Sequence, residues 1–382
     1  MFIQYEKYPK NTLQRNKDML IYTVHKSCVL ERFMRKNYID NLRFIFVLML
    51  FPYHIFMIYN SFGENFYIKG DNIDSVTTFI VLTGAWFMPL LFVIAGISTT
   101  FALQKRNFGE FAKERTTKLI TPLIAGILLV IPAQTYFAER FHNGYTGGYF
   151  AQYILFFTKE TDLTGYTGGF TPAHLWFVFY LFIISLLAIP LIALSRKIKF
   201  DIKNLATPFV VSFFILPFLG NFVLDIGGHS FGEYFAYFML GYFVLSNENI
   251  QQRLEKYRII LLSISLIFMT LRGLFWYGIL NVHPLIFTQF YAWTTILVLI
   301  GFGRKYLDIK NKFTKYMVNS SFAVYIFHQT WIIVVGYYVL QAVAIPFIQM
   351  PLILVFSVIL TFISYEVCKR LKVTRWLFAI KK

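Results

Sequence analysis

The chain has 382 residues, of which 57% are hydrophobic and only 14% are charged. Soluble domains carry about a quarter charged residues, so this composition excludes an ordinary soluble protein and predicts an all-α polytopic membrane protein. The net charge of +17 would suit a nucleic-acid-binding protein. In a membrane protein, however, the distribution of charge matters more than its total, and we expect the lipid bilayer and no nucleic acid as a partner.

Ten apolar runs are expected to cross the bilayer as helices, because nearly all of them approach the length that spans its hydrocarbon core. They cover residues 39–59, 79–101, 119–137, 174–194, 207–224, 232–246, 258–277, 284–302, 321–342 and 346–368, and the run at 232–246 is the shortest.

The positions of the basic residues support this count, since Lys and Arg concentrate in cytoplasmic loops. If the N-terminus is cytoplasmic, 31 of the 36 Lys and Arg fall in cytoplasmic segments. Lys69, Arg140 and Lys159 then lie outside, and Arg43 and Arg272 lie within spans. Without the short run, every later basic segment would fall on the wrong side. The charge pattern therefore predicts ten helices in the plasma or inner membrane, with both termini cytoplasmic.

Three parts follow from this topology. Residues 1–38 form a basic N-terminal segment without the apolar core of a secretory signal, and Met34 is an alternative translation start. Residues 39–368 form the ten-helix domain, and 369–382 a basic tail. The loop at 138–173 is rich in Gly, Tyr and Thr, and is either a flexible cover over a sugar-binding mouth or a disordered connector. Cys28 and Cys368 cannot form a disulfide framework.

Two polar residues share one face of the first span. Arg43 and His54 are eleven positions apart, which on a helix returns to within roughly 20° of the same azimuth, about 16 Å further along. Asp40 lies one turn before Arg43 and can pair with it. Arg43 alone reads as a snorkelling anchor and His54 alone as an interhelical hydrogen-bonding residue. Together they indicate a site, because a neutral imidazole there can accept a proton from a hydroxyl.

The stretch Arg43-x10-His54, preceded by Asp40, resembles the first helix of the acyltransferase 3 membrane family. The resemblance extends over residues 38–382. Further stretches that resemble the family are "MPLLFVIAGIS" (88–98), "KERTTKLITP" (113–122), "HLWFVFYLF" (174–182), "FMLGYFV" (238–244) and "NSSFAVYIFHQ" (319–329). The tail "SYEVCKRLKVTRWLFAIKK" and "FPYHIFMIYNSF" around His54 resemble the branch called glucan biosynthesis protein C, a periplasmic glucan succinyltransferase.

The resemblance implies an O-acyltransferase that moves a succinyl or acetyl group from cytoplasmic acyl-CoA to a hydroxyl of an extracytoplasmic glycan. It implies that Lys113, Arg115 and Lys118 bind the phosphates of the donor where the third helix begins, although ordinary positive-inside charge is the alternative. Arg43 would hold the phosphate end of the donor, and His54 would deprotonate the acceptor hydroxyl. The group that stabilises the oxyanion is not identified.

Other polar residues near the span ends are candidates for contact with the acceptor. His174 lies next to Trp176 at an outer helix end, where it either contacts the acceptor or caps the helix. Tyr325 and His328, one turn apart, either contact the acceptor or form hydrogen bonds within the core.

Three charged residues remain near the ends of their spans. Arg272 and Glu233 either pair with each other or contact an anionic acceptor. Glu366 is expected to neutralise Arg43 or Lys118.

The sequence lacks the motifs of several other functions. The seven histidines are scattered without a His-x3-His pair, and no cysteine cluster is present, so no metal site is expected. Neither a Gly-x-Ser-x-Gly elbow nor a Gly-Lys-Ser/Thr phosphate loop occurs. The contrasting function is a transporter or flippase for a polysaccharide or lipid-linked sugar, since buried charges in many spans also describe transporters. The oligomeric state is open, with a homodimer as one option.

Overall fold

The computed structural model describes residues 37–62, 66–159, 169–197, 205–281 and 285–381. The basic segment expected at 1–38 lies outside these residues except for its last two, and so do Met34 and Cys28. The fold described below is that of the unit Asn37–Lys382 within those ranges.

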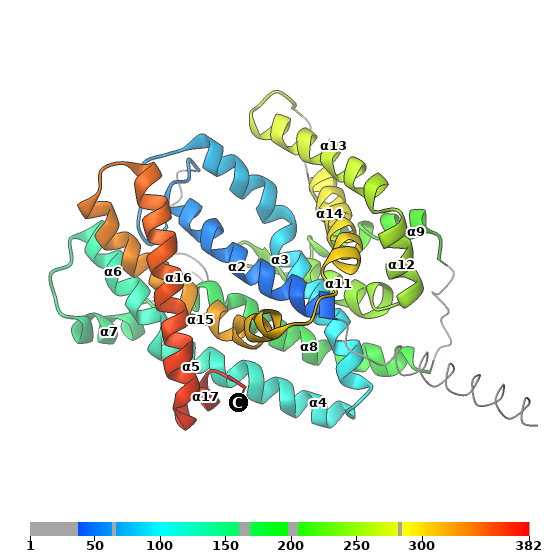
Figure 1. The fold of residues 1–382 in the computed structure, drawn as a ribbon, viewed down its shortest axis with the longest axis horizontal. Helices are drawn as coiled ribbons and strands as arrows, with labels where there is room; N and C mark the ends of the chain where they lie inside the picture. Colours follow the sequence, from blue (N-terminus) through cyan, green and yellow to red (C-terminus); the bar gives the residue numbers. More distant parts are fainter. Residues whose placement is uncertain (1–36, 63–65, 160–168, 198–204, 282–284, 382) are drawn as a thin grey trace, which may run out of the picture. The chain divides into compact units, whose positions relative to one another are not determined.

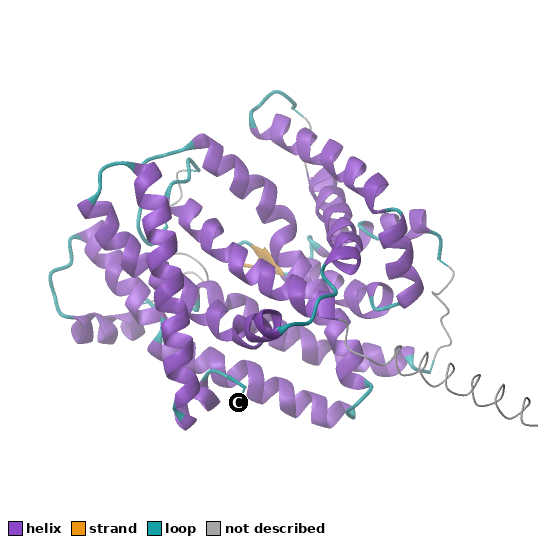
Figure 2. Cartoon of the chain, in the orientation of Figure 1, coloured by secondary structure: helices purple, strands orange, loops and turns teal. Residues whose placement is uncertain are grey.

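The described residues fold almost entirely into helices, with one short hairpin (Figures 1 and 2). The long helices are α2 (Asn37–Ile58), α3 (Asp74–Leu103), α8 (Trp176–Ser195), α13 (Arg258–Trp276), α14 (Leu285–Tyr306), α15 (Lys312–Ala342) and α16 (Pro346–Arg370). A further helical stretch comprises α4 (Phe108–Arg115), the π-helix η1 (Thr116–Ile120), α5 (Thr121–Leu129) and α6 (Ile131–Asn143). The shorter elements are α7 (Tyr149–Thr158), the 3-10 turn η2 (Ala173–Leu175), α9 (Thr207–Ser212), α10 (Ile215–Gly220), β1 (Asp225–Ile226), β2 (His229–Ser230), α11 (Phe231–Leu240), the π-helix η3 (Gly241–Leu245), α12 (Glu248–Lys256) and α17 (Lys372–Leu377).

Among the described residues, eight helical stretches are long and apolar enough to cross a bilayer. This confirms the expected all-α polytopic membrane fold. Two other apolar helices, Thr207–Gly220 and Phe231–Leu245, are shorter. The total of ten crossings and the side on which the termini lie therefore stay predictions.

The span expected at 207–224 is not one helix, because the chain breaks between α9 and α10. Pro217 explains the break. Proline has no N–H to donate to the carbonyl of Phe213, and its ring clashes with that carbonyl in a continuous helix. Phe213 and Phe214 accordingly form a turn.

The loop expected at 138–173 contains regular structure. Helix α6 continues to Asn143, and α7 occupies Tyr149–Thr158. Gln152 and Phe156, four residues apart on α7, are both fully buried, which is the spacing of one helix face. This part of the loop is therefore not a disordered connector, and its role as a cover over a sugar-binding mouth stays a prediction. Residues 160–168 lie outside the described part.

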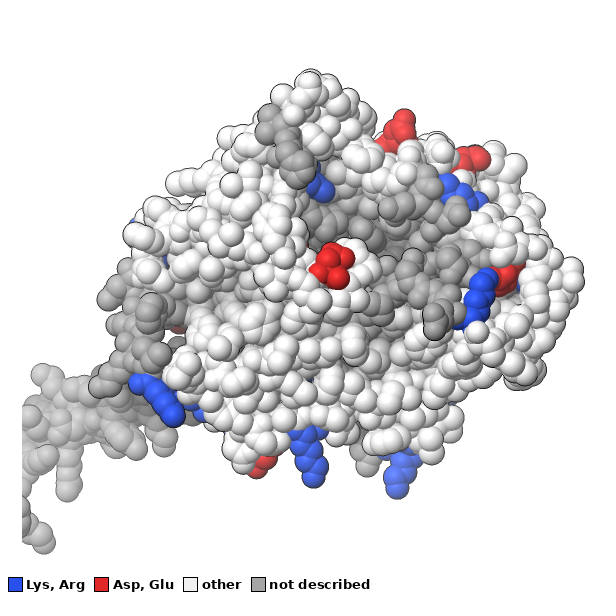
Figure 3. Space-filling view, turned by 180° about the vertical axis from the view of Figure 1, so that it is seen from behind, with Lys and Arg blue, Asp and Glu red and all other residues white. Residues whose placement is uncertain are grey.

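The helices differ in how far they are covered by protein. In α3, 72% of the most apolar stretch is buried, against 11% in α13 and 22% in α16. Most of the face drawn in Figure 3 consists of residues other than Lys, Arg, Asp and Glu, as suits a surface in contact with lipid. Helix α2 packs against α3, α14, α15 and α16 (Figure 1). The helix that carries Arg43 and His54 is therefore surrounded by other spans.

Two glycines allow α3 and the α11–η3 helix to cross with their backbones in contact. A Cβ atom at Gly96 would lie 2.0 Å from the backbone oxygen of Phe238. A Cβ atom at Gly241 would lie 2.2 Å from the backbone oxygen of Val93. Small residues at such crossings let membrane helices approach closely. Gly96, the glycine of the 88–98 stretch, thus has a packing role.

Candidate functional site

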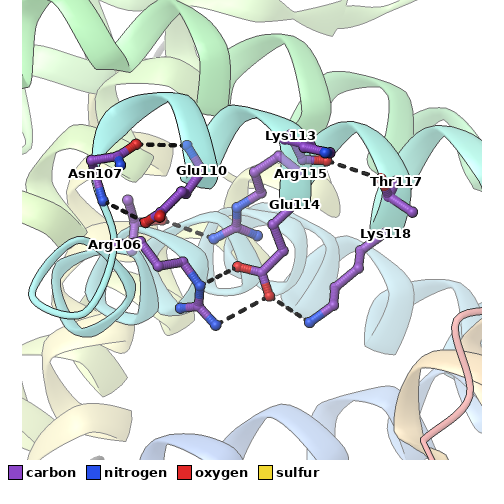
Figure 4. A network of polar contacts seen from close by, with 9 residues as sticks. Arg106, Asn107, Glu110, Lys113, Glu114, Arg115, Thr117 and Lys118 are labelled. Carbon is purple, nitrogen blue, oxygen red and sulfur yellow. Dashed lines mark hydrogen bonds and ion pairs between the residues drawn. The ribbon is translucent and has the colours of Figure 1, made fainter.

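Three of the basic residues expected to bind the donor, Lys113, Arg115 and Lys118, lie on one continuous helical stretch (Figure 4). Asn107 and Glu110 form a capping box that starts α4 at Phe108. Lys118 is therefore well inside the helical stretch, and the expected helix N-terminus is not at the basic motif. Glu114 forms ion pairs with Arg106 and with Lys118. Lys118 thus has an acidic partner four residues before it, one turn along the helix.

Arg115 and Arg43 converge on α3 from different helices. Nη2 of Arg43 donates to Oγ of Ser98 at 2.6 Å, and Nη1 donates to Oδ1 of Asp40 at 2.9 Å. Nη2 of Arg115 donates to Oγ1 of Thr99 at 3.1 Å. The expected pairing of Asp40 with Arg43 is thus present. Both guanidinium groups thus contact the same turn of α3, and a guanidinium group favours anions such as phosphate.

The ring of His54 faces the interior of the helix bundle. Its centroid lies 5.2 Å from that of His328 on α15, and the ring of Phe66 stacks on it at 6.0 Å with an interplanar angle of 14°. The ring of His174 lies 5.0 Å from that of His328. We call His54, His174 and His328 the histidine cluster. His54 is half-buried, whereas His174 is 7% and His328 0% exposed.

Hydrogen bonds to backbone carbonyls fix two rings of the histidine cluster. Nδ1 of His328 lies 2.7 Å from the oxygen of Tyr325, and Nε2 of His174 lies 3.0 Å from the oxygen of Ile326. The hydroxyl of Tyr325 donates to the backbone oxygen of His174. Tyr325 and His328, singled out as acceptor contacts, are thereby tied to His174 inside the core.

Three polar side chains continue from the histidine cluster. Nε2 of Gln134 on α6 donates to Oγ1 of Thr330 at 2.7 Å and lies 3.5 Å from Nδ1 of His174. Nε2 of Gln329 donates to Oε1 of Gln134 at 3.0 Å. These side chains are buried, so the cluster belongs to a polar layer that joins α6, η2 and α15.

Trp176 turns away from the histidine cluster toward the short hairpin. Its ring stacks on that of His229 with centroids 3.8 Å apart and an interplanar angle of 12°. Burial lowers the pKa of His229 to about 4, and the charge of Asp225 opposes that shift. Gly227 and Gly228, both with positive φ, form the turn that places His229 there.

Arg272 and Glu233 do not pair with each other. Arg272 donates from Nε to the backbone oxygen of Val81 at 2.9 Å and from Nη1 to Oγ1 of Thr288 at 2.5 Å. Glu233 is instead hydrogen-bonded to the side chain of Gln289. Both charged groups therefore fasten helices to one another, and the pairing proposed from sequence is wrong.

Glu366 was expected to neutralise Arg43 or Lys118, but it pairs with neither. It accepts a hydrogen bond from the hydroxyl of Tyr316 at 3.0 Å and lies 3.6 Å from Nζ of Lys369. Its partners are therefore Lys369, one turn further along α16, and Tyr316 on the adjacent helix α15.

Sequence reasoning missed the partners of the two arginines and of His174. Ser98 ends the quoted 88–98 stretch, and Thr99 follows it, so polar residues at the end of an apolar run were the available signal. Gln134 is a lone amide in an apolar run and gives a similar signal. Within the described residues, no group of three or more His, Cys, Asp or Glu side chains is arranged to hold a metal ion.

Comparison with known proteins gives one match. A family model described as an acyltransferase domain matches residues 36–366. The matched range includes Arg43 and Arg115, which we call the arginine pair, as well as Lys113, Lys118 and the histidine cluster. It does not distinguish branches within the family. No curated protein and no solved structure matches the chain.

Proposed function

The chain belongs to the acyltransferase 3 family, and from this premise we propose that it transfers an acetyl or succinyl group from acyl-CoA to a glycan hydroxyl across the membrane. Family membership and the helical fold make it a membrane acyltransferase. What we propose is the identity of the donor, the identity of the acceptor and the residues that act on them.

The donor phosphates are assigned to the arginine pair. Arg43 and Arg115 present two guanidinium groups beside Ser98 and Thr99, and a guanidinium matches the geometry of phosphate oxygens. The side chains of Lys113 and Lys118 are exposed on the same helix as Arg115, where they add positive charge on the approach to the pair. This arrangement supports a donor that enters with its phosphates near the arginines and its thioester toward His54.

His54 is assigned the role of general base. The acceptor hydroxyl gives its proton to His54 while its oxygen bonds to the thioester carbonyl carbon. The carbon–sulfur bond then breaks, and the sulfur takes the proton from His54 and leaves as the thiol of CoA. The products are the glycan ester and free CoA, and His54 returns to its neutral form.

The observation that carries the proposal is the orientation of His54. Its ring faces His328 within the bundle instead of lipid, and yet it is only half-buried. A base in this position is shielded from bulk water but not sealed from a substrate. Arg43 lies toward the other end of α2, and Arg115 of α4 contacts the adjacent helix α3.

Mass spectrometry of surface glycans tests the proposal. Cells that carry the chain should show glycans heavier by one acetyl or one succinyl group per modified residue than cells in which its gene is deleted. Identical glycan masses in the two strains would contradict it. Unmodified glycan that accumulates on the inner side in the deletion strain would favour the transporter instead.

A further inference from the structure

Two neighbouring rings of the histidine cluster each carry a buried nitrogen without a hydrogen-bond partner. These atoms are Nδ1 of His54 and Nε2 of His328, and the two ring centroids are 5.2 Å apart. A buried polar atom without a partner destabilises the fold. Two such atoms on adjacent rings therefore point to an interaction that forms between them.

The chemistry of His328 fixes which of its nitrogens accepts. A carbonyl oxygen only accepts hydrogen bonds, so Nδ1 of His328, 2.7 Å from the oxygen of Tyr325, carries the hydrogen. In a neutral imidazole the other nitrogen then has the lone pair. Nε2 of His328 is consequently an acceptor that needs a donor.

His54 is the complementary neighbour. Four rings lie against that of His328, and they belong to Phe51, His54, His174 and Tyr325. Nε2 of His174 and the hydroxyl of Tyr325 already donate to backbone oxygens. Among the described side chains around His328, Nδ1 of His54 is the remaining buried donor without a partner.

We propose that His328 is a positioning residue that accepts the Nδ1 hydrogen of His54 and thereby leaves the lone pair of His54 on Nε2, toward the reacting hydroxyl. The inference rests on the proposed function and adds a second residue to it. The hydrogen bond, at roughly 3 Å between the two nitrogens, requires the ring of His54 to turn toward the ring of His328, which is held in place. The same logic operates where a buried group holds a catalytic imidazole in one tautomer.

The surroundings of His328 suit this role because they prevent its ring from moving away. The side chain is completely buried, Tyr325 holds Nδ1, and the His174 ring packs against it at 5.0 Å. His174 is held in turn by Ile326. The acceptor nitrogen is thus fixed on α15 before substrate arrives.

Two amide substitutions separate positioning from structure. In His328→Gln the amide lies near the place of Nε2, so its oxygen can accept from His54. In His328→Asn the shorter side chain reaches the place of Nδ1, near Tyr325, but not His54. Thr361→Val is the matched control, because it removes another fully buried oxygen without a partner, on α16.

The assay uses the full chain in detergent, acetyl-CoA or succinyl-CoA as donor, and glycan purified from cells that lack the gene as acceptor. We expect His328→Asn to lower kcat about 10- to 100-fold, a part of the roughly 10²- to 10⁴-fold that a general base supplies, with KM for the donor unchanged. We expect His328→Gln to keep most of kcat, and Thr361→Val to match the unsubstituted protein.

Equal kcat values for the Asn and Gln variants would overturn the positioning role, whether both are high or both are low. If the unsubstituted chain is active and His54→Ala is not, equal kcat values for the two His328 variants leave the proposed function intact. If the unsubstituted chain forms no ester at all, the proposed function fails, and the role of His328 fails with it.

Discussion

Arg43 and Arg115, which come from α2 and α4, donate hydrogen bonds to consecutive side chains of α3, Ser98 and Thr99. The first predicted span, and the basic helix α4 that leads into the third, are thereby joined to the second through two guanidinium groups. Like charges converge only where a counter-charge is supplied, and Asp40 supplies one for Arg43. The phosphates of the donor would supply more.

Arg115→Gln should raise KM for acyl-CoA about 10- to 100-fold with little change in kcat, because a hydrogen bond to a charged group is worth about 1.5 to 3 kcal/mol. The exposed Lys105 on the adjoining turn provides the control, since Lys105→Gln should leave KM unchanged. An acyl-pantetheine donor, which lacks the nucleotide phosphates, should be used equally well by the Arg115→Gln variant and the unsubstituted protein. An equal loss with both donors would show that Arg115 does not bind phosphate.

Gly96→Ala should destabilise the fold by about 1 to 3 kcal/mol, because its Cβ would overlap the backbone oxygen of Phe238. The matched control is Gly273→Ala on α13, where a Cβ meets no atom within 4 Å and helix propensity favours alanine by up to about 1 kcal/mol. Thermal unfolding in detergent measures both. A Gly96→Ala protein as stable as the Gly273→Ala protein would contradict the close crossing of α3 with α11.

Acidification should destabilise the stack of Trp176 on His229. Burial lowers the pKa of His229 from 6.5 to about 4, so the unfolded chain binds a proton more readily than the fold does. The stability that neutral His229 contributes is present above pH 6.5 and is lost as the pH falls toward 4, by at most about 1.4 kcal/mol per pH unit. Thermal unfolding should show that the loss of stability between pH 7 and pH 5 is smaller for His229→Gln than for the unsubstituted protein. An equal loss of stability in the two proteins would contradict the lowered pKa of His229.

Much of the fold was predictable because the membrane imposes a simple length and polarity rule on each span. The breaks within apolar runs were harder to predict, since Pro217 follows a break between two helices whereas Pro89 lies inside α3, which has no break. Proline in a membrane helix is tolerated where neighbours satisfy the freed carbonyl, and sequence does not show those neighbours. Helix α7 was missed because glycines and tyrosines around it suggested a loop.

The candidate site was predictable only along one helix. Helical spacing alone places Arg43 and His54 on one face of the first span and Asp40 within reach of Arg43. His174 and His328 are far from His54 in sequence, and nothing in their local pattern indicates that their rings meet. The choice of partner for Glu366 likewise depends on which side chains tertiary packing brings within reach.

The most direct test of the account is the acyl transfer rate of His54→Ala. With the purified full chain, labelled acetyl-CoA or succinyl-CoA, and glycan from cells without the gene, the account predicts that kcat falls by at least about 10²-fold, the usual contribution of a general base. Donor binding and the melting temperature should stay close to those of the unsubstituted protein. A folded His54→Ala protein that forms ester at the unsubstituted rate would contradict the assignment of His54 as the base.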